Sequence, residues 1–217
     1  MSSASKELRT QIIESVRSFT AQGLGVGTSG NLSARTGSGF VITPTGVPYA
    51  ELEPDLLVEM NLEGEVIAGN LKPSSEWRFH CDLYRERKEA GAIVHVHSPF
   101  ATAIACNRME IPSFHYMVAI AGGDNIRCAD YATFGTAELS SNVVAAIENR
   151  KACLMANHGL LAFDGDVTRA FKMAQEVEEL AKQYFFSLQI GQVTILDEDE
   201  MKVVLDKFST YGKQDTK

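Results

Sequence analysis

The sequence predicts a three-layer α/β/α fold, in which helices cover both faces of a mixed, mostly antiparallel sheet. Helical and strand patterns alternate along the chain, which is typical of a sheet flanked by helices on both sides. Several strands are separated only by short turns, which favours antiparallel neighbours. The chain has 217 residues, 45% hydrophobic and 22% charged, and no repeat or Pro/Gly-rich linker divides it. We therefore expect a single domain over residues 1–217.

The helices are predicted from apolar residues at helical spacing and from their caps. An amphipathic helix over 8–19 opens the chain and stops before Gly23. Ser98 and the proline after it suit the N-cap and first position of a second helix. A third spans 139–147, the longest runs over 166–189, and the acidic residues 197–200 form a capping box for the last.

The strands are predicted from short apolar runs bounded by turn residues. Residues 40–42 form one strand, and 56–60 and 65–67 flank a turn and form a hairpin. Residues 92–97 are rich in β-branched side chains, and 153–156 form a further strand. A helix beginning at Ser74 or Ser75 is expected between the hairpin and the strand 92–97.

Charge and cysteine usage narrow the class of protein. The formal net charge is −8 and no stripe of lysine and arginine is present, which argues against a nucleic-acid surface but not against a small anionic substrate. No segment reaches transmembrane length, and no apolar leader is present. The four cysteines lie far apart and are expected to be buried thiols in a reducing compartment, so we expect a cytoplasmic protein.

His95 and His97 are the most informative pair of residues. Two residues apart on a strand, their imidazoles share one face of the sheet. Two neutral imidazoles on one face are half of a divalent-metal site, although two hydrogen-bonded core histidines would give the same pattern. His158 follows a hydrophobic strand and precedes a glycine, which lets the backbone pass close to a metal. Three imidazoles leave a metal open to substrate, and a nearby carboxylate such as Glu76 can act as general base.

Two other histidines do not share this pattern. His80 lies on a predicted helix and is expected to pack in the core, while His115 adjoins Tyr116 and is expected to support the site from behind.

Three loops combine glycine and hydroxyl residues in the manner of an anion site. They are the glycine-rich segment 25–31, the turn 43–46, and the helix start 72–76 with its two serines. Glycines let backbone N–H groups face an anion, and a helix N-terminus favours negative charge. Each loop alone is also explained as an ordinary turn or helix cap. Together they resemble a divided phosphate cradle.

The ordered set of these motifs resembles the class II aldolase/adducin family. The motifs are, in chain order, GTSGN at 27–31, ITPTG at 42–46, PSSEWRFH at 73–80, VHVH at 94–97, NHG at 157–159 and TYG at 210–212. The resemblance runs from the first helix to about Gly212 and implies the fold of that family, a cyclic homotetramer with active sites between subunits, and a mobile tail over about 206–217.

The resemblance also implies a reaction and its residues. It implies a metal-dependent aldolase that cleaves a 1-phosphorylated ketose, such as L-fuculose 1-phosphate, into dihydroxyacetone phosphate and lactaldehyde through an enediolate. His95, His97 and His158 would hold Zn²⁺, and Glu76 would be the acid/base that also visits the metal; imidazole sites accept other divalent metals as well. The residues implied for the phosphate are Gly30, Asn31, Thr45, Gly46, Ser74 and Ser75. Tyr116 would be a second catalytic residue, which protonates or stabilises the aldehyde oxygen across a subunit boundary. Phe134 would line the aldehyde pocket, and Tyr211 would belong to the mobile tail.

Several alternatives remain at this level. The aldehyde half could instead come from a deoxy-pentulose or methylthio-pentulose 1-phosphate. Relatives of the same fold act as sugar-phosphate epimerases, decarboxylases or dehydratases. An adducin-like interaction module, or a binding protein without turnover, would keep the fold, but the three histidines and Glu76 argue against both.

Overall fold

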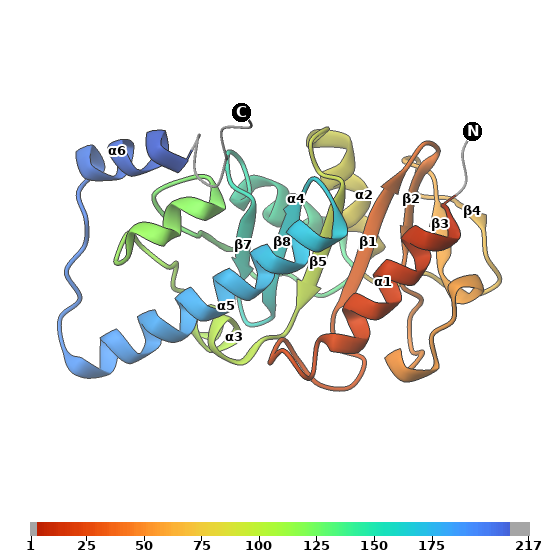
Figure 1. Ribbon diagram of the computed structural model, residues 1–217, viewed down its shortest axis with the longest axis horizontal. Coiled ribbons are helices and arrows are strands. Elements are labelled where there is room, and N and C mark those ends of the chain that lie inside the picture. The colour runs from red at the N-terminus through yellow and green to blue at the C-terminus, as the bar shows by residue number, and fades with distance from the viewer. Residues whose placement is uncertain (1–3, 209–217) are drawn as a thin grey trace, which may run out of the picture.

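One sheet organises the molecule (Figure 1). The computed structural model describes residues 4–208, and in that range the sheet has eight strands in the order β4-β3-β2-β1-β5-β8-β7-β6. The strands are β1 (Asn31–Thr36), β2 (Gly39–Ile42), β3 (Val58–Met60), β4 (Val66–Ala68), β5 (Ala92–Val96), β6 (Cys128–Ala129), β7 (Ala152–Met155) and β8 (Gly159–Asp164). Strand β6 pairs with β7 in parallel, and every other pairing is antiparallel.

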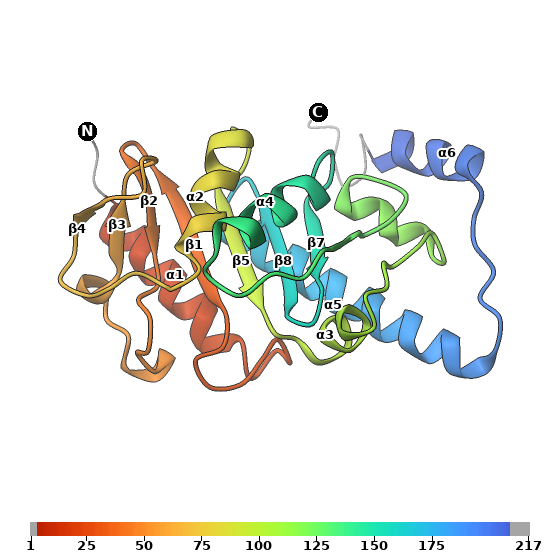
Figure 2. The ribbon, with the colours of Figure 1, turned by 180° about the vertical axis from the view of Figure 1, so that it is seen from behind.

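Helices cover both faces of this sheet. Helices α1 (Lys6–Ser18), α3 (Pro99–Cys106) and α5 (Val167–Ile190) lie on one face, seen in front in Figure 1. Helices α2 (Trp77–Glu86) and α4 (Ala137–Ala146) lie on the other, seen in front in Figure 2. Each face has its own buried apolar cluster. The predicted three-layer α/β/α fold with a mixed, mostly antiparallel sheet is confirmed.

Shorter elements complete the chain. The 3-10 turns η1 (Tyr49–Glu51) and η2 (Pro54–Leu56) precede β3. Turn η3 (Tyr116–Ala121) packs against the last helix, α6 (Glu198–Phe208), through a small apolar cluster at one end of the molecule. Of the tail expected from residue 206 onward, 206–208 end α6, and the rest, Tyr211 included, lies outside the described residues. None of the described helices has the length and apolar character needed to cross a membrane.

Strand β5 is the strand on which the site depends. It lies between β1 and β8, with Asn31 opposite His95 on one side and Leu161 opposite His95 on the other. Its side chains alternate: Val94 and Val96 join the cluster under α1 and α5, while Ile93 joins the cluster under α2 and α4. His95 follows the parity of Ile93 and therefore faces α2.

The predicted helices and strands form with small shifts at their ends, and three strands, β1, β6 and β8, were not predicted. Glu76 stands at the N-cap position immediately before α2 rather than inside the helix. Ser98 takes the N-cap position of α3 but makes no capping hydrogen bond with its side chain. Instead the Glu178 carboxylate on α5 accepts from the backbone N–H groups of Phe100 and Ala101. A charged acceptor from a neighbouring helix replaces the expected local cap.

The cysteines are only partly as expected. All four are free thiols, and Cys81 and Cys153 are buried, but Cys128 is half-buried and Cys106 is exposed. The expectation of four buried thiols is wrong for Cys106, because it ends α3 where that helix reaches the surface.

Candidate active site

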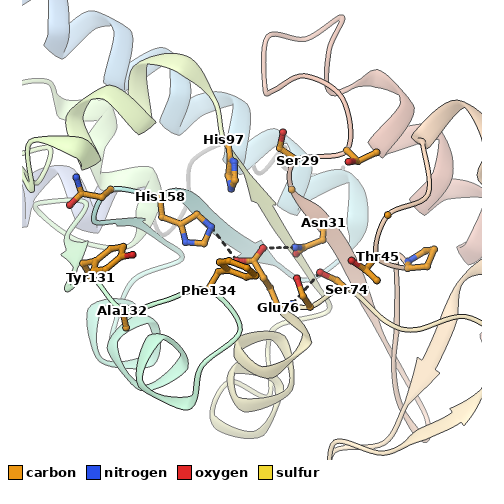
Figure 3. A pocket seen from close by; sticks show the side chains of 16 residues that line it. Ser29, Asn31, Thr45, Ser74, Glu76, His97, Tyr131, Ala132, Phe134 and His158 are labelled. Carbon is orange, nitrogen blue, oxygen red and sulfur yellow. Dashed lines mark hydrogen bonds and ion pairs between the residues drawn. The ribbon is translucent and has the colours of Figure 1, made fainter.

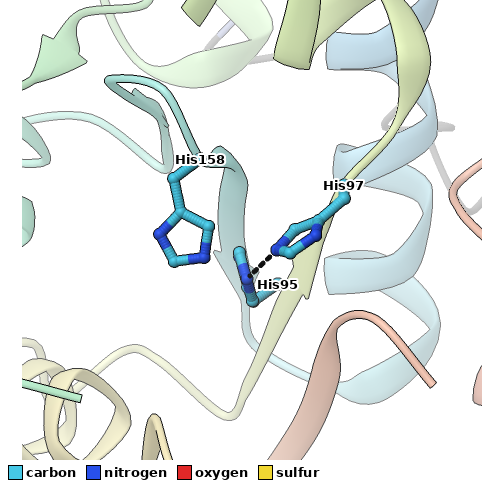
Figure 4. Close-up of side chains that lie close together, drawn as sticks. All are labelled: His95, His97 and His158. Atoms are coloured by element: carbon cyan, nitrogen blue, oxygen red, sulfur yellow. Dashed lines mark hydrogen bonds between the residues drawn. The ribbon is translucent and has the colours of Figure 1, made fainter. Parts of the chain in front are cut away.

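Three histidines converge at the end of β5 (Figure 4). His95 lies on β5, His97 directly follows it, and His158 lies in the turn between β7 and β8. One ring nitrogen from each can be chosen so that all three lie within 4.8 Å of one another. The Nε2 atoms of His95 and His97 are 3.0 Å apart. The residues predicted as metal ligands are thus brought together by the fold.

Burial favours a neutral ring at His97, and a backbone hydrogen bond orients the ring of His95. The Nδ1–H of His95 donates to the backbone carbonyl of Leu160 at 2.9 Å, so its Nε2 presents a lone pair toward the other rings. Burial, together with repulsion from His95 and His158, lowers the pKa of His97 to about 4. A neutral ring with a free lone pair is the form that binds a metal.

The Glu76 carboxylate lies against the same cluster. Its Oε1 is 3.1 Å from Nε2 of His158, and its Oε2 is 3.3 Å from Nε2 of His95. Burial alone raises the pKa of Glu76, but the adjacent rings of His95 and His158 outweigh burial and hold the pKa well below its usual range. Oε1 is buried and has no hydrogen-bond partner. A partnerless buried carboxylate oxygen beside three converging imidazoles suits a divalent cation.

The close approach of these residues depends on glycine. A side chain at Gly159 would place its Cβ 2.5 Å from the carbonyl oxygen of Val96 and 2.9 Å from Cδ2 of His97. At Gly30, where φ is +100°, a Cβ would lie 2.5 Å from the carbonyl oxygen of His95. Both glycines allow neighbouring segments to pass beside the histidines at distances that any larger residue would prevent.

The three hydroxyl-and-glycine loops surround a cavity of about 320 Å³ beside the cluster (Figure 3). Its lining includes eleven residues predicted or noted from the sequence: Thr28, Ser29, Gly30, Asn31, Thr45, Gly46, Ser74, Ser75, Glu76, His97 and His158. Tyr49 steadies the first loop, because its hydroxyl donates to the backbone carbonyl of Gly30 at 2.8 Å. Among the described residues that line the cavity there is no lysine or arginine, so an anion there would be held by hydroxyls, amides and any bound cation.

Of the residues predicted for the aldehyde, the structure places Phe134 and Tyr116 in different parts of the molecule. Phe134 lines the cavity and is 65% exposed. Tyr116 does not line the cavity of its own chain; it lies on η3, beside α6, and is half exposed. His115 accepts a hydrogen bond from the N–H of Met117 and helps to form η3. Tyr211 lies outside the described residues.

Some cavity residues were not assigned to the site from the sequence. Thr28 and Ser29 belong to the glycine-rich loop that was singled out, so the loop itself was their signal. Asn157 precedes His158 and takes a left-handed backbone, with φ of 53°. Tyr131 follows β6, a two-residue strand, and no sequence pattern marked it.

The prediction that His80 only packs in the core is wrong. It is fully buried and stacks on Phe79, but its Nε2 also lies 2.5 Å from Oδ1 of Asn31, and its Nδ1 lies 2.7 Å from Oγ of Ser33. Burial, with repulsion from His95, lowers the pKa of His80 to about 3. His80 is therefore a neutral, hydrogen-bonded neighbour of the site.

Replacement of Gly159 by alanine should weaken metal binding. The new Cβ would displace His97, so we expect the affinity for Zn²⁺ to fall by about tenfold or more. Isothermal titration calorimetry on metal-depleted protein measures this. Gly165→Ala is the matched control, because a Cβ there meets nothing closer than 3.8 Å. Equal affinity in both variants would contradict the assignment of His97 as a ligand.

Burial of neutral His80 should make stability depend on pH. Its pKa is about 3 in the folded protein and about 6.5 in the unfolded chain, so as the pH falls below about 6.5 the unfolded state binds a proton that the folded state does not. The free energy of unfolding should then fall by up to about 1.4 kcal/mol per pH unit, until about pH 3. Above pH 6.5 the residue should contribute no slope.

Urea unfolding of the metal-free protein at a series of pH values measures this slope. His80→Gln should lose the His80 part of it, whereas His115→Gln, on η3, should keep it. Parallel pH profiles for wild type and His80→Gln would show that His80 does not carry the effect.

Both the sequence and the fold of this chain have known relatives. Residues 10–185 match the family described as Class II Aldolase and Adducin N-terminal domain. A 5-methylthioribulose-1-phosphate/5-deoxyribulose-1-phosphate aldolase of Rhodospirillum rubrum is 54% identical, covering 94% of this chain and 92% of the relative. An L-fuculose phosphate aldolase of Escherichia coli is 46% identical, covering 95% and 96%. A solved L-fuculose 1-phosphate aldolase superposes with a TM-score of 0.92 at 38% identity, covering 95% of this chain and 98% of that one. The chain belongs to the class II aldolase and adducin family, and it is an aldolase, a lyase of the metal-dependent class.

Proposed function

We propose that this aldolase cleaves a 1-phosphorylated ketose into dihydroxyacetone phosphate and a short aldehyde that ends in an apolar group. The observation that carries the proposal is a buried carboxylate, Glu76, held against three converging imidazoles beside a cavity rimmed by hydroxyl and amide groups. A base beside a metal site, next to an anion cradle, is what the formation of a phosphorylated enediolate needs.

His95, His97 and His158 are the residues that would hold the metal, with Glu76 as a further ligand when substrate is absent. We propose Zn²⁺, in keeping with three nitrogen ligands that leave a position open. When bound, the ion supplies Lewis acidity that stabilises negative charge on the ketone oxygen of the substrate.

Glu76 is proposed as the acid/base. Its Oε2 is engaged by the Nδ2 group of Asn31 at 3.0 Å, whereas Oε1 has no hydrogen-bond partner. In the direction of aldol addition, Oε1 would take the proton from the carbon next to the ketone of dihydroxyacetone phosphate. In cleavage the same oxygen would return a proton to that carbon after the bond to the aldehyde breaks.

The phosphate is proposed to lie between the three loops. The residues that would bind it are Gly30, Asn31, Thr45, Gly46, Ser74 and Ser75. Backbone N–H groups at glycine turns and before α2, together with the serine and threonine hydroxyls, supply donors without a cationic side chain.

The aldehyde end is proposed to face Phe134 and its neighbour in the lining, Tyr131. Both rings are more than half exposed, as suits a wall against which an apolar substrate end can pack. Tyr116 can reach such a cavity only from another copy of the chain, which fits the proposed homotetramer with sites between subunits. Tyr211 is proposed for the same end from the family resemblance.

Two classes of substrate fit this description. L-fuculose 1-phosphate would release lactaldehyde, and a 5-deoxy- or 5-methylthio-pentulose 1-phosphate would release another short aldehyde. The relatives at 54% and 46% identity carry these two names in that order. Both substrates carry a phosphate at one end and a methyl or methylthio group at the other.

A panel of 1-phosphorylated ketoses tests the proposed reaction. Each is incubated with zinc-loaded protein, and release of dihydroxyacetone phosphate is followed by a coupled reduction. We expect cleavage of ketoses with an apolar end to exceed that of their hydroxylated counterparts. Consumption of substrate without dihydroxyacetone phosphate would indicate an epimerase, decarboxylase or dehydratase, and no turnover of any ketose would refute the proposal.

Glu76→Gln should separate metal binding from catalysis. The three histidines remain, so Zn²⁺ should still bind, but exchange of the proton of labelled dihydroxyacetone phosphate with water should fall by about 10²–10⁴-fold. Glu63→Gln, in the β3–β4 turn, is the surface control. Normal proton exchange in the Glu76 variant would remove Glu76 from its proposed role.

A further inference from the structure

A row of buried polar side chains leads away from the Glu76 carboxylate. The Nδ2 group of Asn31 donates to Oε2 of Glu76 at 3.0 Å. His80 Nε2 lies 2.5 Å from Oδ1 of Asn31, and His80 Nδ1 lies 2.7 Å from Oγ of Ser33. The Ser33 hydroxyl in turn lies 2.8 Å from the hydroxyl of Tyr84. The row thus ends four side chains away from the carboxylate.

Two matching periodicities build this row. Asn31 and Ser33 lie two residues apart on β1 and so face the same side of the sheet. His80 and Tyr84 lie four residues apart on α2 and so share one face of the helix. Two strand residues span about 6.6 Å and four helical residues about 6 Å, so the two pairs interleave.

Hydrogen-bonding capacity gives the row a single direction. An ionised Glu76 can only accept, so Asn31 must turn its NH₂ group toward Glu76 and its Oδ1 toward His80. His80 must then carry its proton on Nε2, which leaves Nδ1 as an acceptor for the Ser33 hydroxyl. The single hydroxyl hydrogen of Ser33 is then used in the bond to His80, so the Tyr84 hydroxyl donates to the Ser33 oxygen. Every donor points toward the carboxylate.

Burial removes the alternatives to this arrangement. Ser33 and His80 are fully buried, and Asn31 and Tyr84 are exposed by 2% or less, so water does not offer other partners. A flipped Asn31 amide would set its carbonyl oxygen against the Glu76 carboxylate, so that two acceptors would face each other. The amide is therefore held in one orientation.

We propose that His80, Ser33 and Tyr84 are positioning residues for the reaction, which lock the Asn31 amide and through it the Glu76 carboxylate. With Asn31 fixed on Oε2, Oε1 is the oxygen that stays free to meet the substrate. This inference rests on the proposed role of Glu76, but the row itself can be tested without any substrate.

The first test reads the proton of His80 by NMR. In ¹⁵N-labelled, metal-free wild-type protein at neutral pH, long-range imidazole correlations should show His80 protonated on Nε2 and unprotonated on Nδ1, assigned by loss of the signals in His80→Gln. Protonation on Nδ1, or on both nitrogens, would reverse or break the row and overturn the proposal. This result does not depend on which reaction the enzyme catalyses.

The second test replaces His80 by two amide side chains of different length, Gln and Asn. The amide nitrogen of Gln can take the place of Nε2, whereas Asn ends near the place of Nδ1 and cannot reach Asn31. We expect His80→Asn to lower kcat by about 10- to 100-fold at nearly unchanged KM, and His80→Gln to restore most of it. Ser140→Ala is the matched control, because Ser140 is a buried hydroxyl that donates to Asp82 of α2 outside the row and should leave kcat unchanged.

The experiments distinguish failure of the positioning role from failure of the proposed function. If both His80 variants keep wild-type kcat, or if Gln restores nothing although it unfolds at the same temperature as Asn, the positioning role fails. If wild type itself cleaves no phosphorylated ketose and exchanges no proton of dihydroxyacetone phosphate, the proposed function fails, and the positioning role falls with it even if His80 proves to be protonated on Nε2.

Discussion

The structure of the site depends on keeping one carboxylate charged inside the protein. Glu76 is 7% exposed, and an isolated charge at such a place costs several kcal/mol. The groups around it are the amide of Asn31, which donates to Oε2, and the imidazoles of His95 and His158 within 3.3 Å. These groups come from β1, β5 and the β7–β8 turn, so the charge is stable only when three distant parts of the chain have assembled around the start of α2.

Strand β5 makes that assembly possible. Because β1 and β8 flank it, two registers meet on β5: one sets Asn31 opposite His95, and the other sets Leu160 opposite Val96 and brings the turn with His158 to the same end. Glycines allow both neighbours to approach: Gly30 beside the backbone of His95, and Gly159 beside that of Val96. The proposed metal ligands and the proposed base therefore come together through these two registers, and a slip of β5 by one residue would turn His95 to the opposite face.

The sequence predicted the parts of the site that have a local signal. The His95–His97 spacing, the loops rich in glycine and hydroxyls, and the helix before β5 are patterns within a few residues, and the family resemblance ordered them. What could not be predicted depends on contacts between distant segments. His80 was expected to pack because nothing nearby shows that β1 supplies Asn31 and Ser33 to its ring. Ser98 was expected to cap α3, but Glu178, 80 residues later, does so. Strands β1 and β8 were not predicted because each begins within a sequence that is typical of a loop or a turn, and β6 was not predicted because it has only two residues.

The cavity divides into two parts that are built differently, and this division bears on how substrate choice can change in such a fold. In the polar part Asn31, Ser74 and Glu76 are buried and hydrogen-bonded to one another, so a change at Asn31 or Ser74 disturbs the proposed base as well as the proposed anion cradle. The apolar part consists of the exposed rings of Phe134 and Tyr131, which carry few of the contacts that hold the sheet together. Surface substitutions of that kind usually alter stability by less than about 0.5 kcal/mol. The proposed aldehyde wall can therefore change with less effect on stability than the carboxylate and the groups that contact it, and two similar relatives are named for different ketoses.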